Sequence, residues 1–174
     1  MASLNYDTAM RREELCKLEL SDIDQSRNTV RVRAETTKTK YGRRAIYSPG
    51  TAKLLLQYIR SRRPISPTTT ALFLSESYRN EGDPIGRGTW TKVIESVAKR
   101  ANLPRFTTHT FRHLRITDLV RQGVGIVEIS RFVGHRDINT TNQYVHLQED
   151  DLLEKTAETI VSLRGKQLPE YSAI

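Results

Sequence analysis

One short stretch of this chain, Thr29–Arg33, alternates apolar and charged residues, which is typical of a β-strand with one buried face. A polar, basic stretch from 35 to 44 follows, with Gly42 as a turn residue, and Ala45–Tyr47 predicts a returning strand. The segments on either side of this hairpin carry apolar residues at helical spacing. We therefore predict a mainly α (α+β) fold, with a small antiparallel sheet near the N-terminus and a basic hairpin tip.

The helical segments follow one another with polar connections, and Gly123 and Gly134 stand where two of them should end. A segment at 71–74 predicts a short strand or turn, Trp90 and Cys16 are expected in the core, and residues 165–174 are expected to form a frayed tail. The predicted helices cover residues 4–20, 51–62, 89–101, 108–123, 126–133, 140–146 and 150–163.

The composition favours a soluble protein that binds a polyanion. Among 174 residues there are 28 Lys and Arg against 20 Asp and Glu, a net charge of +8, which suits nucleic acid. No apolar run is long enough to span a membrane, and no secretory signal opens the chain, so we expect a cytoplasmic location. Because a helical pattern begins almost at once, we expect residues 1–174 to be one domain of a longer protein whose upstream partner is absent.

Two residues on one predicted helix suit phosphate chemistry. His109 and Arg112 are three positions apart, so both project to the same side of the helix. A guanidinium can hold two phosphate oxygens in a bidentate fork, and an imidazole beside it can donate to phosphate or manage a proton. Alone, this spacing is more often a solvated helix face. It gains weight because Gly134-His135 and Tyr144 follow within 36 residues.

The order His109-x-x-Arg112, then Gly134-His135, then Tyr144 resembles the signature of the tyrosine recombinase (phage integrase) family. Residues 8–15, Thr-Ala-Met-Arg-Arg-Glu-Glu-Leu, are similar to that family's first motif, Thr-Gly-Leu-Arg-x-x-Glu-Leu, with alanine in place of the usual glycine. The resemblance extends from residue 4 to about residue 164. It implies a helical catalytic domain of the DNA breaking and rejoining type, and site-specific DNA recombination through a 3′-phosphotyrosyl intermediate.

The resemblance also implies a role for each matching residue. Arg11 and Arg112 would clamp the phosphate, although Arg12 is an alternative to Arg11, and Tyr144 would be the nucleophile. His109 would manage a proton or donate to the phosphate, and His135 would donate to a phosphate oxygen. The hairpin would supply the general acid, Lys38 or else Lys40. Contacts with DNA are expected from the hairpin residues Lys40, Arg43 and Arg44.

The implied partners are double-stranded DNA and further copies of this chain, which would form a tetramer on DNA through the last predicted helix. No cofactor or metal is implied. His113 lies four residues after His109, a spacing also found in zinc sites, but cationic Arg112 between them disfavours a metal. Three rival functions stay open: a type IB topoisomerase-like enzyme, a non-catalytic DNA-binding protein on a recombinase scaffold, and a metal-dependent hydrolase.

Overall fold

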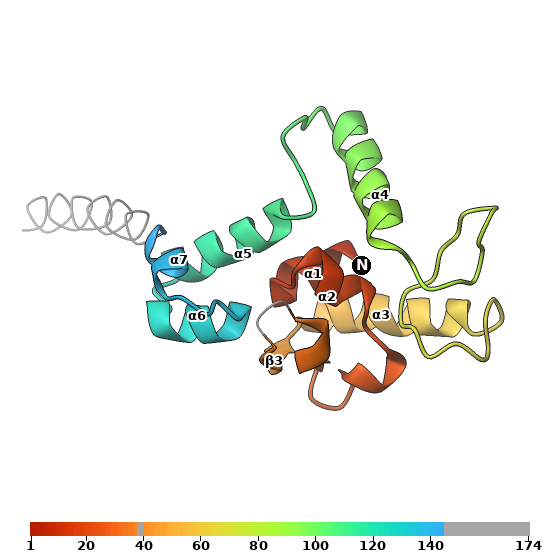
Figure 1. The fold of residues 1–174 in the computed structure, drawn as a ribbon, viewed down its shortest axis with the longest axis horizontal. Coiled ribbons are helices and arrows are strands. Elements are labelled where there is room, and N and C mark those ends of the chain that lie inside the picture. Colours follow the sequence, from red (N-terminus) through yellow and green to blue (C-terminus); the bar gives the residue numbers. More distant parts are fainter. Residues whose placement is uncertain (38–39, 145–174) are drawn as a thin grey trace, which may run out of the picture.

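The protein is described from a computed structural model, which describes residues 1–37 and 40–144. Helices dominate this part of the chain, and a three-stranded antiparallel sheet lies near its N-terminal end (Figure 1). The predicted mainly α fold with a small antiparallel sheet is therefore confirmed. Lys38, the predicted helix at 150–163 and the predicted tail at 165–174 lie outside the described residues.

The first predicted helix, 4–20, is wrong as a single element. The structure has α1 at Ala2–Thr8 and α2 at Arg12–Cys16, followed by the 3-10 turn η1 at Leu20–Asp22. Between the two helices Ala9 adopts φ 49° and ψ 29°, the left-handed conformation that ends a helix. This turn redirects the chain at the position where the family's first motif carries glycine, which adopts that conformation without steric cost.

The predicted hairpin is confirmed, with strands β2 at Thr29–Val32 and β3 at Arg43–Ile46 and the 3-10 turn η2 at Ala34–Thr36 between them. Val30 pairs with Ala45 in this antiparallel register, and both are buried. A two-residue strand that the sequence did not predict, β1 at Ile23–Asp24, pairs with the other edge of β2. The sheet therefore places one face in the core and leaves Arg31 on the other.

Two longer helices cover the core beside the sheet. Helix α3 spans Pro49–Arg62 and is capped by Ser48, whose Oγ accepts from the backbone N–H of Thr51 at 3.2 Å. Helix α4 spans Arg87–Arg100 and begins after Gly86, two residues before the predicted start. The predicted strand or turn at 71–74 contributes isolated bridges from Ala71 and Leu74.

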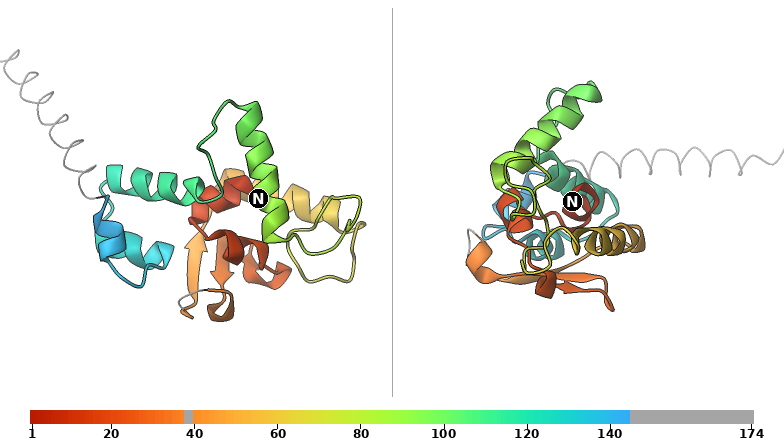
Figure 2. Two further views of the ribbon diagram at one scale, coloured as in Figure 1. Left: turned by 45° about the horizontal axis from the view of Figure 1, so that its top comes forward. Right: turned by 90° about the vertical axis from the view of Figure 1, so that its right-hand side faces the viewer.

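The C-terminal part of the described chain is a compact group of three helices. Helix α5 spans Thr110–Arg121, α6 spans Ile126–Val133, and α7 spans Asn139–Asn142, which is shorter than predicted. Gly134 ends α6 with φ 70°, as expected from the sequence. Figure 2 shows these helices gathered at one end of the molecule, away from α4.

The buried residues form two clusters that meet at the turn between α1 and α2. The larger cluster joins α1, α2, the sheet, α3 and α4, and includes Cys16 and Trp90 as predicted. Burial raises the pKa of the Cys16 thiol to about 11, so this side chain is a buried thiol without nucleophilic character at neutral pH. The smaller cluster joins Ala9 to α5, α6 and Tyr144.

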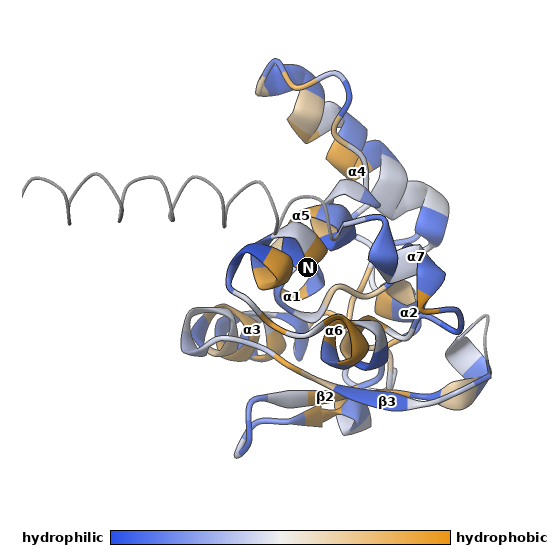
Figure 3. Cartoon of the chain, turned by 90° about the vertical axis from the view of Figure 1, so that its left-hand side faces the viewer, coloured by the Kyte–Doolittle hydropathy of each residue, from blue (hydrophilic) through white to orange (hydrophobic). Residues whose placement is uncertain are grey.

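The two clusters are also connected by α6, which packs against β3. Figure 3 shows β3 beneath α6. None of the helices within residues 1–37 and 40–144 has the length and apolar character needed to cross a bilayer.

Candidate active site

Five of the six predicted catalytic residues line one pocket of about 330 Å³, namely Arg11, His109, Arg112, His135 and Tyr144. They come from the start of α2, the start of α5, the loop after α6 and the residues after α7. The sixth, Lys38, lies outside the described residues. Residues that are up to 133 positions apart in sequence thus meet where the two buried clusters join.

Arg112 is held deep in this pocket, with 2% of the residue exposed. Its Nη1 donates to the carbonyl oxygen of Ala9 at 2.7 Å, whereas its buried Nη2 has no hydrogen-bond partner among the described residues. Burial and the charges of Arg11 and Arg43 lower its pKa to about 9, so it remains a cation at neutral pH. A buried cation with an unused donor is suited to an anionic oxygen.

Arg11 reaches the same pocket from the first residue before α2. Its Nη1 forms an ion pair with Glu14 at 3.1 Å, and its Nη2 donates to the carbonyl oxygen of Gly134 at 3.2 Å. Arg12 points elsewhere, because its Nη1 donates to Thr91 Oγ1 in α4 at 2.7 Å. Of the two arginines that the sequence offered for this position, Arg11 is the one in the pocket.

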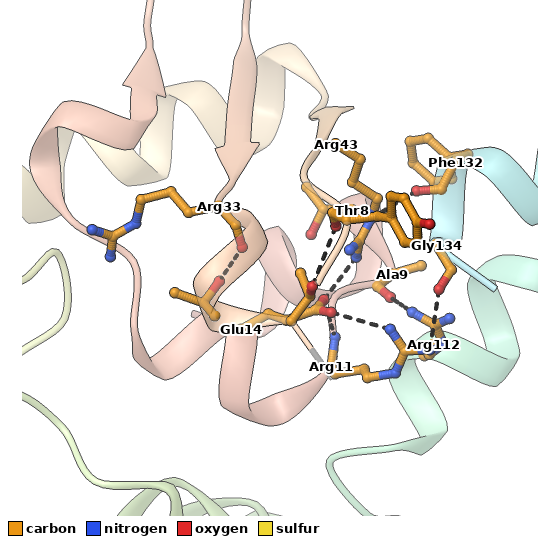
Figure 4. A network of polar contacts seen from close by, with 12 residues as sticks. Thr8, Ala9, Arg11, Glu14, Arg33, Arg43, Arg112, Phe132 and Gly134 are labelled. Atoms are coloured by element: carbon orange, nitrogen blue, oxygen red, sulfur yellow. Dashed lines mark hydrogen bonds and ion pairs between the residues drawn. The ribbon is translucent and has the colours of Figure 1, made fainter. Parts of the chain in front are cut away.

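Glu14 organises the arginines around it (Figure 4). Its buried carboxylate accepts from the Arg11 backbone N–H at 3.0 Å and from Arg43 Nη2 at 2.7 Å. Burial alone would raise the pKa of Glu14, but the Arg43 hydrogen bond and the charges of Arg43 and Arg11 outweigh it and hold the pKa below its ordinary value. The carboxylate is therefore ionised and joins α2 to β3.

Arg43, expected from the sequence to contact DNA, is placed in an internal contact instead. Only 9% of its side chain is exposed, and its Nε donates to the carbonyl oxygen of Phe132 at 3.0 Å. Arg43 and Arg11 thus satisfy two carbonyl groups at the C-terminal end of α6, which otherwise have no partner within the helix. They fix the backbone immediately before His135.

The two predicted histidines have different surroundings. His135 Nδ1 lies 2.7 Å from the hydroxyl of buried Thr141, and burial together with the charges of Arg112 and Arg11 lowers its pKa to about 4. His135 is therefore neutral near pH 7. Burial also lowers the pKa of His109, and the nearby charges of His113 and Arg112 add to this effect.

Tyr144 closes the pocket and packs into the smaller buried cluster, with 8% of the residue exposed. Its hydroxyl is hydrogen-bonded to Nδ1 of His113. Burial raises the pKa of Tyr144, while the charge of Arg112 and a hydrogen bond with Gln143 act in the opposite direction. The phenol is therefore protonated at neutral pH and needs a proton acceptor before it can act as a nucleophile.

Sequence reasoning missed Glu14, Thr141 and His113 as parts of this site. Glu14 had a detectable signal, since it stands at the capping-box position three residues after Arg11. The His109–His113 spacing is also visible in the sequence, but by itself it indicates a metal-binding pattern and not a contact with Tyr144. Within the described residues, no group of three or more His, Cys, Asp or Glu side chains is arranged to hold a metal ion.

A second pocket, of about 490 Å³, adjoins the first and is lined by the hairpin and the end of α6. Arg131 and Arg136 line it together with Tyr41, and His135 is shared with the first pocket. The two other hairpin residues expected to contact DNA, Lys40 and Arg44, are exposed. Positive charge therefore continues from the first pocket onto the neighbouring surface.

The described pocket combines the phenol of Tyr144 with cations that are already in place. Arg11 and Arg43 pair with the buried carboxylate of Glu14, and Arg112 adds a third positive charge near that single carboxylate, so an excess of positive charge remains where a phosphate oxygen would bind. Such preorganised donors stabilise the added negative charge of a pentavalent phosphorus transition state. The pocket is therefore equipped for attack of a phenol on a phosphodiester.

The chain belongs to the phage integrase family, whose sequence pattern matches residues 1–151. It is 29% identical over 151 residues to the tyrosine recombinase XerC of Corynebacterium glutamicum, covering 87% of this chain and 47% of that protein. It is 32% identical over 158 residues to the tyrosine recombinase XerD of Staphylococcus aureus strain Mu50, covering 87% of this chain and 50% of that protein. The chain thus spans about half the length of the curated relatives that it matches.

Solved structures agree with this assignment. The crystal structure of XerA recombinase superposes with a TM-score of 0.76 at 28% identity, covering 90% of this chain and 56% of that one. The catalytic domain of bacteriophage HP1 integrase superposes with a TM-score of 0.60 at 19% identity, covering 90% of this chain and 78% of that one, and supports the fold alone.

Proposed function

We propose that this chain is the catalytic domain of a site-specific DNA recombinase that cuts one DNA strand through a 3′-phosphotyrosyl intermediate on Tyr144. The observation that carries the proposal is the pairing of Tyr144 with Arg112 in one pocket. The buried Nη2 of Arg112 has no protein partner in residues 1–37 and 40–144, and a phosphate oxygen would satisfy it.

In the proposed cleavage step, the Tyr144 Oη forms a bond to phosphorus while the bond from phosphorus to the 5′ oxygen breaks. Arg11 and Arg112 bind the two non-bridging oxygens, and neutral His135 donates through Nε2 while Thr141 donates to its Nδ1. A hairpin lysine, Lys38 or Lys40, protonates the leaving 5′ oxygen. The covalent phosphotyrosine conserves the bond energy, so a 5′ hydroxyl of another strand can reseal the DNA without ATP.

Double-stranded DNA is the proposed partner. Two proteins of the same fold were solved with DNA: XerH recombinase bound to its difH substrate, and the Tn1549 transposon integrase with circular intermediate DNA. In this chain, exposed Arg136 lines the pocket that would receive the phosphodiester, and exposed Lys40 and Arg44 lie on the hairpin that borders the adjoining pocket. We also propose self-association on DNA as a tetramer, through the predicted helix at 150–163 that lies outside the described residues.

A covalent trapping experiment tests the proposed function. The protein is incubated with a pool of short duplexes of randomised sequence, each nicked near the expected cleavage point so that the short product is lost and religation fails. A DNA adduct that survives denaturing electrophoresis is expected for wild type and for Tyr78→Phe, a control at a tyrosine that is 99% exposed. Tyr144→Phe should bind DNA and give no adduct, and an adduct in that variant would contradict the proposal.

A further inference from the structure

His113 is not one of the residues that the sequence predicted to be catalytic, yet its Nδ1 is hydrogen-bonded to the hydroxyl of Tyr144. The two rings lie with centroids 5.9 Å apart and are tilted by 37°. Because Tyr144 is the proposed nucleophile, His113 touches a reacting atom directly. This contact joins the first turn of α5 to the residue two positions after α7.

The hydrogen bond offers a direct path for the phenolic proton of Tyr144. Because Tyr144 keeps its proton at neutral pH, its O–H can donate to Nδ1 of His113 when a neutral His113 carries its own proton on Nε2. Nδ1 is therefore the atom that would receive the phenolic proton.

The surroundings of His113 suit transfer and release of that proton. His113 is exposed, in contrast to Tyr144, so an imidazolium formed at this position stays in contact with water. The His109 ring stands edge-on to it, with centroids 4.6 Å apart and an interplanar angle of 86°. The other charged or titratable groups that line the same pocket are Arg11, Arg112, His135, Arg136 and Asp137.

We infer that His113 is the general base of the cleavage step and accepts the proton of Tyr144 as its oxygen attacks phosphorus. This inference rests on the proposed function of Tyr144. As the Oη–phosphorus bond forms, the phenolic proton moves to His113 Nδ1. The bond from phosphorus to the 5′ oxygen breaks, and that oxygen takes a proton from the general acid of the hairpin.

Resealing of the DNA strand runs the two proton transfers of the cleavage step in reverse. The incoming 5′ hydroxyl attacks the phosphotyrosine and gives its proton to the hairpin lysine, and the departing Tyr144 oxygen takes back the proton held by His113. No proton or electron is gained or lost over the cycle. A base at this position is expected to contribute a rate factor of about 10²–10⁴.

The other two histidines of the pocket are placed for different tasks. The Nδ1 of His135 is hydrogen-bonded to Thr141, so Nε2 is the nitrogen left to donate to a phosphate oxygen. The contact recorded for the His109 ring is with the ring of His113 and not with the hydroxyl of Tyr144. His113 is thus the histidine whose contact with the nucleophile the structure records.

The test separates a base from a residue that only holds the tyrosine in place. In His113→Asn, the side-chain oxygen occupies nearly the position of Nδ1 and accepts a hydrogen bond without taking the proton, whereas His113→Ala removes both functions. Single-turnover adduct formation on the nicked duplexes is measured for both variants, with Leu114→Ala as a control for an exposed α5 residue. Folding and DNA binding are checked by thermal melting and fluorescence anisotropy.

A general base predicts that both variants lose about 10²-fold or more in rate and that added imidazole restores His113→Ala. Wild-type-like cleavage by His113→Asn would reduce His113 to a positioning residue and overturn the inference. If wild type itself gave no adduct at Tyr144, the proposed function would fail instead, and the two failures are thereby distinguished.

A DNA-independent measurement completes the test. Nitrogen-15 NMR of the free protein should show neutral His113 with its proton on Nε2, and Tyr144→Phe should change the Nδ1 signal. A proton on Nδ1 in wild type would also overturn the inference, because that nitrogen could not accept from the phenol.

Discussion

The Nη1 atom of Arg112 donates a hydrogen bond of 2.7 Å to the carbonyl oxygen of Ala9, which lies 103 residues earlier in the chain. This bond joins the first turn of α5 to the left-handed turn between α1 and α2. It fixes the plane of the guanidinium and leaves Nη2 unpaired within the described residues. The proposed phosphate clamp therefore depends on a backbone turn far away in sequence.

Replacing Arg112 by lysine tests this arrangement. Arg112→Lys keeps the positive charge but cannot hold Ala9 and a phosphate oxygen together, because lysine has no planar fork. We expect cleavage to fall by about 10²–10³-fold, the range found for loss of one transition-state donor. DNA affinity, measured by anisotropy at fixed salt, should fall much less. Equal losses in both would show that Arg112 only binds DNA.

Arg11 and Arg12 form a matched pair for a second test. Arg11 lines the pocket, whereas Arg12 contacts Thr91 on α4, so Arg11→Ala should abolish most adduct formation and Arg12→Ala should stay close to wild type. Because Arg11→Ala also removes a partner of buried Glu14, thermal melting must accompany the rate measurement. The reverse order of activities would place Arg12 at the phosphate.

Ala9 offers a prediction about stability. Ala9→Gly loses a buried methyl group worth about 0.8 kcal/mol but relieves about 1 kcal/mol of left-handed strain, so the free energy of unfolding should change little. Ala9→Val adds bulk in a fully buried, left-handed position and should destabilise by about 1–3 kcal/mol. Urea denaturation of both variants checks this, and tolerance of valine would contradict the description of the turn.

The choice between Lys38 and Lys40 can be made with a modified substrate. If Lys38 protonates the leaving 5′ oxygen, Lys38→Ala should cut normal DNA slowly. It should cut a substrate with a 5′-bridging sulfur nearly as fast as wild type, because that leaving group needs little protonation. Equal impairment of Lys38→Ala on both substrates would assign Lys38 to phosphate contact. Lys40→Ala would then be the variant expected to cut the sulfur substrate nearly as fast as wild type.

Much of the site was predictable because its motifs are local. His109 and Arg112 lie three residues apart at the start of one helix, and Gly134 ends another helix. Both features can be recognised from the sequence alone. The break at Ala9 was missed because alanine favours helix, and its left-handed conformation depends on tertiary contacts that hold its carbonyl group.

Contacts between distant elements could not be derived from spacing. Arg43 follows the basic tip of the hairpin and looks like a surface residue, but α6 packs on β3 and buries its guanidinium against Glu14 and Phe132. The hydrogen bond between His113 and Tyr144 likewise depends on how α7 lies against α5 and α6. Pairwise contacts of this kind appear only once the helices are assembled.

Mapping the DNA attachment site tests the central claim most directly. The chain has seven tyrosines, and residues 137–155 form a tryptic peptide in which Tyr144 is the one tyrosine. After trapping on nicked duplexes and digestion with nuclease and trypsin, mass spectrometry should find a nucleotide joined through its 3′ phosphate to this peptide at Tyr144. Attachment at any other residue would contradict the account.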